Sequence, residues 1–578
     1  MRLSTTVSVA LSLLLAGPSS AEYHSCSLIG PSVPIPKAVS STSAFQDALV
    51  SIKKAIADAI SSGSTPYGGL DLDANSTSFS LDIFSIHEEE TLFTYHYDAP
   101  GLAGSTDGVK KVDSDSIYRI GSISKLLTIY TFLATVGDAS FNEPITKYIL
   151  ELAEYAAQQA EYDHTEFMDW DSITIGFLAS QLGGIPREVA GSPRTDELLL
   201  SQRFPPGVPV PEFTPVPENI TDAKCPNPRG VPCTRAGVLG SINFQHPTLA
   251  PSWGPAYSNV AFALLQYALE NMTNQSFPDL FASKLIKPLN LKDTYYTKAP
   301  LSEGVVPHND SVAQYTLDLM GISAGGNFYA STKDMRAIGK AILNSTLLSP
   351  AQTRRWMKPL SFTANDAMLV GAPWEIYKAP LDDRSVWMYT KGGDIGLYST
   401  QIILLPDYGT GFNFLGAGDQ AAKVKAAIAE IVSGIAVPAF EEAAKEEAGH
   451  VYAGTYTRPG SNDTFVLTVD KNPGLLVSRF LINGTDVVDA FAARGNPIRL
   501  FPSGLQGRDG LRRGFRAILT HEPVPEGAFV QNCIDWLALA GGVLGGVAVD
   551  DIVITLGASG NKAVEVDLRG FRVAYSRS

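Results

Sequence analysis

Residues 123–136 (ISKLLTIYTFLATV) constrain the fold more than any other segment of the chain. The segment is hydrophobic on most of its faces, which predicts a helix buried inside a core. Ser122 precedes it and Lys125 follows three residues later, so both side chains share one face. Unpaired backbone N–H groups at a helix start favour negative charge, and burial lowers the pKa of a lysine because it disfavours the charged form. The segment therefore predicts a nucleophilic serine with a lysine base.

Two later motifs carry side chains that suit the same chemistry. Tyr257 and Asn259 are two residues apart before an apolar helix expected over 260–270, and an extended backbone points both the same way. A tyrosine there can carry the proton between the serine and the leaving group, while the amide orients the substrate and the lysine. Lys391 is expected to end an apolar strand, and the glycines after it permit close approach of a substrate backbone.

Each motif alone has a structural explanation. Ser51-Ile52-Lys53-Lys54 repeats the Ser-x-x-Lys pattern in the middle of a polar-faced helix, where lysines face solvent. A Tyr-x-Asn pair is also typical of a buried tyrosine followed by a helix cap, and a Lys-Gly-Gly segment is also typical of a turn with an exposed lysine. Only the order and the combination of the motifs favour an acyl-transfer site.

Together the motifs resemble the serine β-lactamase and penicillin-binding-protein-like superfamily, closest to its class C, esterase and D-aminopeptidase branch. The resemblance covers about residues 40–435 and includes four further segments. These are residues 118–121 (YRIG), 175–186 (IGFLASQLGGIP), 286–295 (IKPLNLKDTY) and 323–335 (SAGGNFYASTKDM).

The resemblance implies an α+β fold, in which helices flank an antiparallel sheet and a mostly helical subdomain adjoins it. It also implies the role of each motif residue. Ser122 would be the nucleophile, Lys125 and Tyr257 the general base and acid, and Asn259 a positioning group. Lys391 and Gly393 would contact the substrate, and the backbone N–H groups of Ser122 and Asp394 would form the oxyanion hole.

The chain departs from the family pattern in ways that bear on the substrate. The third motif has Gly392 where β-lactamases usually carry threonine, and residues 180–183 (SQLG) replace a His-Thr-Ser-Gly stretch. No Glu-x-x-Leu-Asn segment is present. These departures favour a small ester, amide or peptide substrate, with an esterase or transacylase ahead of a D-amino-acid peptidase and a true β-lactamase last.

Two rival functions remain. Residues 321–325 (GISAG) match the Gly-x-Ser-x-Gly nucleophile elbow, although the next expected helix starts only near Thr332. A binding protein with a retired active site is the other alternative. Against it, every polar group that covalent catalysis needs is present.

The chain as a whole is expected to form two domains, because 578 residues exceed what one hydrophobic core usually supports. A hydrolase domain is expected over residues 22–447, with an irregular Pro-rich insertion at 204–251, and an all-β domain over 448–578. Within the first, the pattern predicts these further elements: helices over 42–61, 277–286 and 332–344, a mostly helical stretch at 151–201, a hairpin of strands 79–86 and 91–97, strands over 385–391, 398–405 and 411–416, and a helical stretch over 419–447 in which Pro438 marks a break or a restart.

The N-terminus predicts secretion. Arg2, an apolar run over 7–16 and small residues at 19–21 are typical of a signal peptide covering residues 1–21, and the run is too short to span a bilayer. An N-terminal anchor is the alternative. Eight Asn-x-Ser/Thr acceptors fit an extracellular compartment: Asn75, Asn219, Asn271, Asn274, Asn309, Asn344, Asn462 and Asn483.

Four cysteines in an oxidising compartment predict disulfides. The favoured pairing joins Cys225 to Cys233 and Cys26 to Cys533, although three connectivities are open. No Cys-x-x-Cys or His-x-His spacing indicates a metal site, and no cofactor is expected. The net charge of −15 argues against nucleic acid or an anionic membrane as a partner.

Overall fold

The computed structural model describes residues 28–65, 73–159, 163–189, 233–243, 245–381, 384–492, 497–519 and 535–578, together with residues 161 and 208. The predicted signal peptide at 1–21 and most of the Pro-rich insertion therefore lie outside the described residues. In the described part of the chain, no helix combines the length and the apolar character needed to cross a membrane.

The chain divides into two compact units. The first comprises residues Ile35–Leu381 and Ser385–Glu447. The second comprises Ala448–Ser578 together with the described residues 28–34 and Arg384, whose guanidinium donates to the carbonyl of Gly30 at 3.1 Å.

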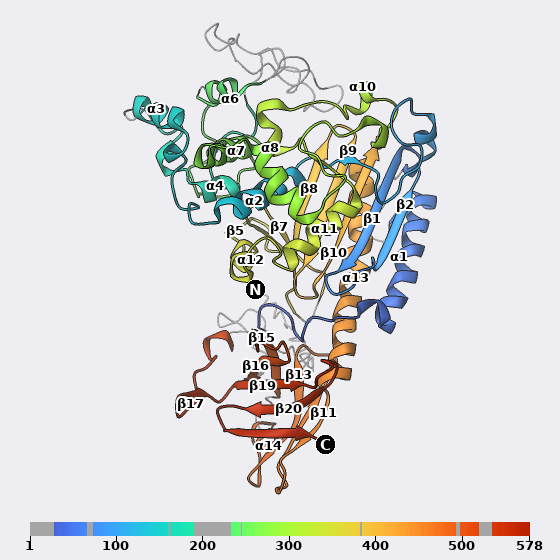
Figure 1. Ribbon diagram of the computed structural model, residues 1–578, viewed down its shortest axis with the longest axis vertical. Helices are drawn as coiled ribbons and strands as arrows, with labels where there is room; N and C mark the ends of the chain where they lie inside the picture. The colour runs from blue at the N-terminus through green and yellow to red at the C-terminus, as the bar shows by residue number, and fades with distance from the viewer. Residues whose placement is uncertain are drawn as a thin grey trace, which may run out of the picture. The chain divides into compact units, whose positions relative to one another are not determined.

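An antiparallel sheet of eight strands forms the centre of the first unit (Figure 1). The spatial order is β2-β1-β10-β9-β8-β7-β6-β5. The strands are β1 (Thr77–Ser85), β2 (Phe93–Tyr97), β5 (Ser361–Phe362), β6 (Met368–Val370), β7 (Glu375–Lys378), β8 (Trp387–Ile395), β9 (Tyr398–Leu405) and β10 (Thr410–Gly418). The predicted hairpin is confirmed as the β1–β2 pair. Every residue of β1 and β10 is buried, because helices cover both faces of the sheet.

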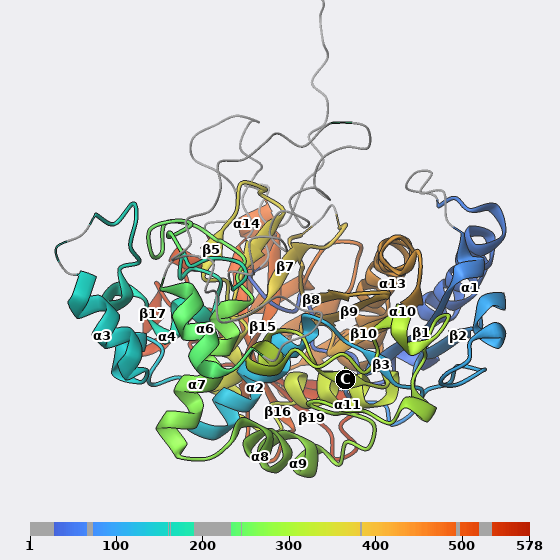
Figure 2. The same cartoon turned by 90° about the horizontal axis from the view of Figure 1, so that it is seen from above.

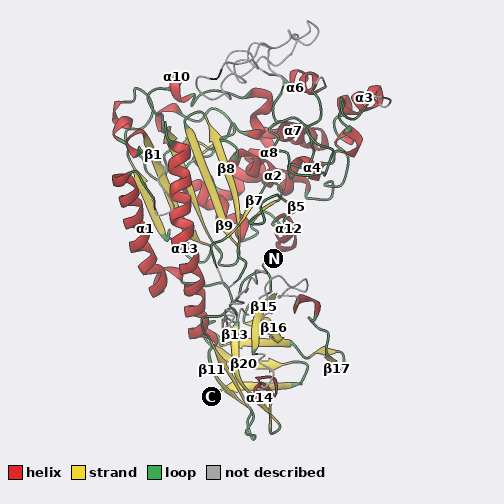
Figure 3. Cartoon of the chain, turned by 180° about the vertical axis from the view of Figure 1, so that it is seen from behind, coloured by secondary structure: helices red, strands yellow, loops and turns green. Residues whose placement is uncertain are grey.

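Helices α1 (Ser43–Ser62) and α13 (Ala421–Tyr452) cover one face of this sheet, as Figure 3 shows. The rings of Phe45 and Phe440 stack between them with centroids 5.5 Å apart. Helix α1 ends at Ser62, and its C-cap Gly63 has a φ of 69°, a conformation that glycine adopts without strain. On the opposite face, α11 (Thr332–Leu343) contacts β1, β9 and β10, and α2 (Ile123–Val136) contacts β8 and β9 (Figure 2).

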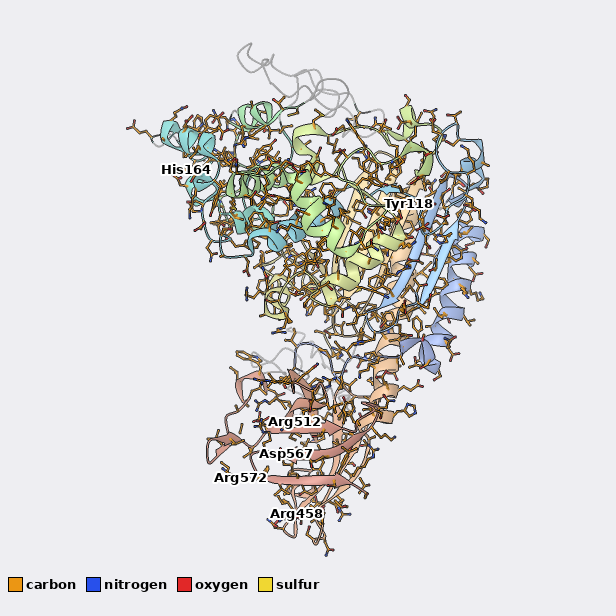
Figure 4. The ribbon with its side chains drawn as sticks, viewed as in Figure 1. Tyr118, His164, Arg458, Arg512, Asp567 and Arg572 are labelled. Carbon is orange, nitrogen blue, oxygen red and sulfur yellow. The ribbon has the colours of Figure 1, made fainter. Side chains whose placement is uncertain are left out.

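A group of helices surrounds α2 and forms the helical part of the fold. It consists of α3 (Leu150–Gln159), α4 (Ile175–Ala179), α6 (Arg235–Ile242), α7 (Val260–Thr273), α8 (Phe277–Phe281), α9 (Lys287–Leu289), α10 (Asp310–Ala313) and α12 (Pro350–Trp356). Two short strands, β3 (Tyr118–Arg119) and β4 (Tyr329–Ala330), pair beside them. Tyr118, labelled in Figure 4, places its hydroxyl 3.1 Å from Ser80 Oγ on β1, so the strand that leads to Ser122 is tied to the sheet.

The stretch at 151–201, expected to be mostly helical, lies partly outside the described residues; its described part contains α3, α4 and turns between them, in which the carboxylates of Asp163 and Asp169 accept backbone N–H groups. Two expectations about local structure are wrong. Pro438 does not break α13, since the buried side chains of Val437 and Phe440 beside it hold the helix in place. The insertion at 204–251 is not irregular throughout, because it contains α6.

The second unit is a strand-rich domain whose antiparallel sheet closes on itself. Its order is β12-β11-β21-β20-β19-β16-β15-β13-β14, and an additional β12–β13 pairing joins the two sides into a barrel. The strands are β11 (Gly454–Thr457), β12 (Thr464–Thr468), β13 (Leu475–Ile482), β14 (Thr485–Asp486), β15 (Ile498–Gln506), β16 (Arg512–Leu519), β19 (Asp551–Leu556), β20 (Ala563–Leu568) and β21 (Val573–Arg577). A small hairpin of β17 (Val543–Leu544) and β18 (Val547–Ala548) and a short helix α14 (Val487–Ala492) complete the domain, which is therefore not purely β. Closure removes exposed sheet edges.

Candidate active site

Ser122 stands at the start of α2 and remains partly exposed, whereas Lys125 in the first turn is fully buried. Gly121 before the serine has a φ of 50°, a conformation that strains other residues. A side chain at Gly121 would also lie 2.7 Å from the backbone nitrogen of Asp394. The turn that presents Ser122 thus depends on a glycine packed directly against β8.

Lys125 is held by three close oxygen atoms. Its Nζ lies 2.9 Å from Ser122 Oγ, 2.6 Å from Asn259 Oδ1 and 2.5 Å from the carbonyl oxygen of Gly325. Burial holds the pKa of Lys125 well below its ordinary value, and the positive charge of nearby Lys391 lowers it further. A lysine in this state gives up its own proton more readily than an exposed one, so it is better suited to act as a base.

Tyr257 lies among positive charges. Its ring centroid is 5.0 Å from Lys125 Nζ, 4.9 Å from the guanidinium carbon of Arg187 and 5.4 Å from Lys391 Nζ. The ring is therefore next to the Ser122–Lys125 pair, as the motif order predicts. Within the described ranges, no residue is hydrogen-bonded to the Tyr257 hydroxyl.

Asn259 connects the site to two residues that the sequence analysis missed. Its backbone N–H donates to the carbonyl of Arg187 at 2.8 Å, and its Nδ2 donates to Glu188 Oε1 at 2.5 Å. Arg187 Nε lies 3.5 Å from the same carboxylate oxygen. Both residues directly follow the segment at 175–186, so their place in the chain was the available signal.

Lys391 does not end its strand, because β8 continues through both glycines to Ile395 and pairs with β9 along that length. Its Nζ donates to Glu375 Oε1 at 2.5 Å, and Glu375 Oε2 accepts from the backbone N–H of Gly392 at 3.0 Å. Burial lowers the pKa of Lys391, but the facing Glu375 carboxylate, together with smaller contributions from Tyr257 and Asp394, outweighs it, so the net pKa is raised. Glu375 has no sequence motif around it and was not predicted.

Strand β8 approaches the nucleophile at Gly393. A side chain there would lie 2.0 Å from the carbonyl oxygen of Ile120 and 2.9 Å from the backbone nitrogen of Ser122. The backbone nitrogens of Ser122 and Asp394 are thus near one another, which an oxyanion hole requires. The Asp394 carboxylate accepts from Lys425 Nζ at 2.8 and 3.0 Å and from Ser399 Oγ, which anchors this end of the strand.

The nucleophile-elbow alternative at residues 321–325 is contradicted. Ser323 is buried, and its Oγ donates to Asp318 Oδ1 at 3.3 Å. The segment is a 3₁₀ helix over Met320–Gly325 rather than a turn from a strand into a helix. The carbonyl of Gly325 instead binds Lys125.

The other predicted sites are only partly within the described residues. Cys233 is disulfide-bonded, but the other three cysteines lie outside the described residues, so both pairings stay predictions. The same holds for Asn219, whereas Asn75, Asn271, Asn274, Asn344, Asn462 and Asn483 are exposed and Asn309 is half-buried.

Other parts of the described structure are separate from the Ser122 site. A cavity of about 230 Å³ lies beside the start of β1 and includes the His308–Asp419 pair, but it shares no lining residue with the Ser122 site. In the described portion of the chain, no group of three or more His, Cys, Asp or Glu residues is arranged to hold a metal ion.

Comparison with known proteins agrees with the geometry. Residues 86–433 match the family described as β-lactamase. The chain belongs to this family. Residues 444–578 match a second family, described as "Beta-lactamase-like-like, C-terminal domain". The predicted superfamily and the α+β fold class are thereby confirmed.

Two fungal relatives extend over most of this β-lactamase family member. A β-lactamase-like protein of Arthroderma benhamiae is 27% identical over 519 residues, which are 84% of this chain and 82% of that protein. A probable hydrolase of Phoma sp. is 25% identical over 506 residues, which are 84% of this chain and 78% of that protein. Among solved structures, a β-lactamase/D-alanine carboxypeptidase from Yersinia pestis has 19% identity and a TM-score of 0.45, covering 68% of this chain and 99% of that one. The protein is a member of a β-lactamase-like family of hydrolases.

Proposed function

We propose that this protein is a secreted serine hydrolase or acyltransferase that cleaves an ester or amide through a covalent acyl-enzyme. One observation carries the proposal: a fully buried lysine whose Nζ lies 2.9 Å from the Oγ of a partly exposed serine. Burial keeps the lysine neutral enough to accept the serine proton.

The hydrogen bonds of Lys125 support the direction of proton transfer. A neutral amine has two N–H groups and one lone pair. The carbonyl oxygen of Gly325 and the Oδ1 of Asn259 only accept, so they take both N–H groups. The lone pair is then left for the Ser122 hydroxyl, which donates its proton.

The reaction would proceed in two stages. Lys125 takes the proton as Ser122 Oγ bonds to the carbonyl carbon, and the backbone N–H groups of Ser122 and Asp394 stabilise the oxyanion. The bond to the leaving group then breaks, and the leaving group takes the proton through Tyr257. Water, or an acceptor alcohol or amine, attacks the acyl carbon in the second stage and restores the serine.

The charge around Lys391 favours substrates without a carboxylate at this position. Glu375 already neutralises the ammonium, and Gly392 supplies no hydroxyl beside it. We therefore place esters and uncharged amides ahead of D-amino-acid peptides, and β-lactams last.

Secretion and glycosylation complete the proposal. The signal-peptide pattern at residues 1–21, the acceptor asparagines and the even number of cysteines support an extracellular protein. Six acceptor asparagines have exposed side chains, as glycosylation requires.

A substrate panel tests the function directly. p-Nitrophenyl esters, D-aminoacyl amides and nitrocefin would be assayed with the wild-type protein, Ser122→Ala and Ser323→Ala. We expect hydrolysis of at least the esters, its loss in Ser122→Ala and its retention in Ser323→Ala. Tyr257→Phe should lower turnover by about 10²- to 10⁴-fold without unfolding the protein. No turnover of any substrate by the wild type would favour the retired binding protein.

A further inference from the structure

Glu188 is the one acidic side chain that hydrogen-bonds the side-chain amide of Asn259, within the part of the chain that the structure describes. Its Oε1 accepts from Asn259 Nδ2 at 2.5 Å. Half of its side-chain surface is exposed, and the partial loss of solvent around the carboxylate is the largest cause of a raised pKa of Glu188, which the hydrogen bond from Asn259 and the charge of Lys125 oppose. No part of the proposed proton transfer uses this residue.

The amide of Asn259 can face Lys125 with either its oxygen or its nitrogen, and the two orientations have opposite consequences. With Oδ1 toward Lys125, the amide accepts an N–H and leaves the lone pair to Ser122. With Nδ2 toward Lys125, the amide would donate to the lone pair. Lys125 would then donate to Ser122 Oγ and could not take its proton.

An ionised carboxylate decides between these orientations, because it accepts hydrogen bonds and cannot donate them. Glu188 therefore requires the Nδ2 of Asn259 on its own side and leaves Oδ1 for Lys125. A glutamine in its place could donate to Oδ1 and stabilise the reversed amide.

We propose that Glu188 is a positioning residue that fixes the orientation of the Asn259 amide and thereby directs the lone pair of Lys125 at Ser122. The inference rests on the proposed function for its catalytic consequence. Its structural core is the chain of contacts Glu188–Asn259–Lys125–Ser122, which joins α2, the start of α7 and the loop after α4.

The charge of Glu188 adds a second effect that can be measured separately. Four charged groups act on Lys125: Lys391 and Arg187 lower its pKa, while Glu188 and Glu375 raise it. The ring of Tyr257 also faces the Lys125 ammonium position. Removing the Glu188 charge should move the pKa of Lys125 further down. The acid limb of the pH profile, along which Lys125 loses its proton, should then move to lower pH.

The test compares Glu188→Gln and Glu188→Asp in the full-length protein, with p-nitrophenyl acetate as a neutral probe. Glu188→Gln should lower kcat by roughly tenfold to a hundredfold, because it should remove part of the rate enhancement that a correctly positioned base supplies. KM should change by less than about threefold. The acid limb of this variant should lie at lower pH. Glu188→Asp keeps a carboxylate that only accepts hydrogen bonds, so its kcat should be much closer to that of the wild type than the kcat of Glu188→Gln is. Glu151→Gln is the matched control, because it removes a carboxylate from another Arg–Glu pair, that of Arg235 on α6.

Several results would overturn the inference: wild-type kcat in Glu188→Gln, no recovery in Glu188→Asp, or a loss confined to aminoacyl substrates. The Lys125 ¹³Cε resonance, assigned with Lys125→Met, gives a readout that needs no turnover. Its titration should move to lower pH in Glu188→Gln, and an unchanged titration would also reject the inference. Failure of the proposed function is distinct, because it would show as equal hydrolysis by wild type and Ser122→Ala.

Discussion

Lys391 Nζ and Glu375 Oε1 lie 2.5 Å apart, so the cation of the third motif is already paired inside the protein. The lysine is almost fully buried, with 2% of its side chain exposed, and Glu375 is 25% exposed. A buried ion pair of this kind is costly to break, because the remaining charge has no partner. The pairing sets both the stability of β8 and the electrostatic character of the site next to Gly392.

The first prediction concerns this ion pair. Glu375→Gln keeps the shape of the side chain but frees the charge of Lys391, so the protein should bind a carboxylate more tightly there. Inhibition by 3-carboxyphenylboronic acid should strengthen relative to phenylboronic acid, and the protein should lose about 2 kcal/mol of unfolding free energy. An unchanged ratio of the two inhibition constants would show that Lys391 does not face the ligand.

The second prediction follows from the lowered pKa of Lys125. The base must be neutral to act, so kcat/KM should rise with pH through the folded pKa of Lys125 and level off above it. Because burial places that pKa well below the ordinary lysine value, the rise should be complete well below the pH at which an exposed lysine loses its proton. A profile that still climbs steeply near pH 10, the ordinary range for lysine, would contradict the assignment.

The third prediction uses two adjacent glycines as a matched pair. A side chain at Gly393 would meet backbone atoms of Ile120 and Ser122 at 2.0 and 2.9 Å, whereas one at Gly392 would meet only the ends of the Gln401 and Glu375 side chains, at 3.1 and 3.5 Å. Gly393→Ala should therefore displace β8 from the nucleophile and reduce kcat/KM by about a hundredfold. Gly392→Ala should retain most activity. Equal effects would argue against close approach at Gly393.

The fourth prediction concerns stability rather than catalysis. Burial, with repulsion from Asp334 as the next contribution, raises the pKa of Asp293 to about 6. The folded state thus binds a proton more tightly than the unfolded state, and the contribution to stability is lost as pH rises through about 6. Asp293→Asn should stabilise the protein by about 1 kcal/mol at pH 7.5, a value reduced for solvent screening, and by nothing near pH 4. Urea unfolding of the wild type and Asp293→Asn at both pH values measures this difference in stability. An equal difference between the two proteins at pH 4 and pH 7.5 would contradict the prediction.

Local patterns in the sequence predicted the helices and strands in which apolar side chains recur at a regular spacing. The apolar residues of α2 determine a buried helix whatever surrounds them, and its bounds at Ile123 and Val136 agree with the prediction. The end of β8 was missed because Gly392 and Gly393 are poor strand residues, and only pairing with β9 keeps them extended. Such pairing depends on residues that are distant in the chain.

The residues of the candidate site likewise divide into those that local sequence predicts and those that only the fold brings together. Ser122 and Lys125 share a helix turn, so their contact follows from spacing alone. Glu188 and Glu375 reach Asn259 and Lys391 only through the fold, and single acidic residues without a motif give no sign of such a role. The partners that tune the charges of the site are therefore the part that needed the structure.

The central claim is that Ser122 forms a covalent bond with help from Lys125. Incubation with a fluorophosphonate, followed by intact-mass measurement and peptide mapping, tests this most directly. The account predicts one adduct per wild-type chain, located on Ser122, absent from Ser122→Ala and formed about 10²- to 10⁴-fold more slowly in Lys125→Met. An adduct on another residue, or an unchanged rate in Lys125→Met, would contradict it.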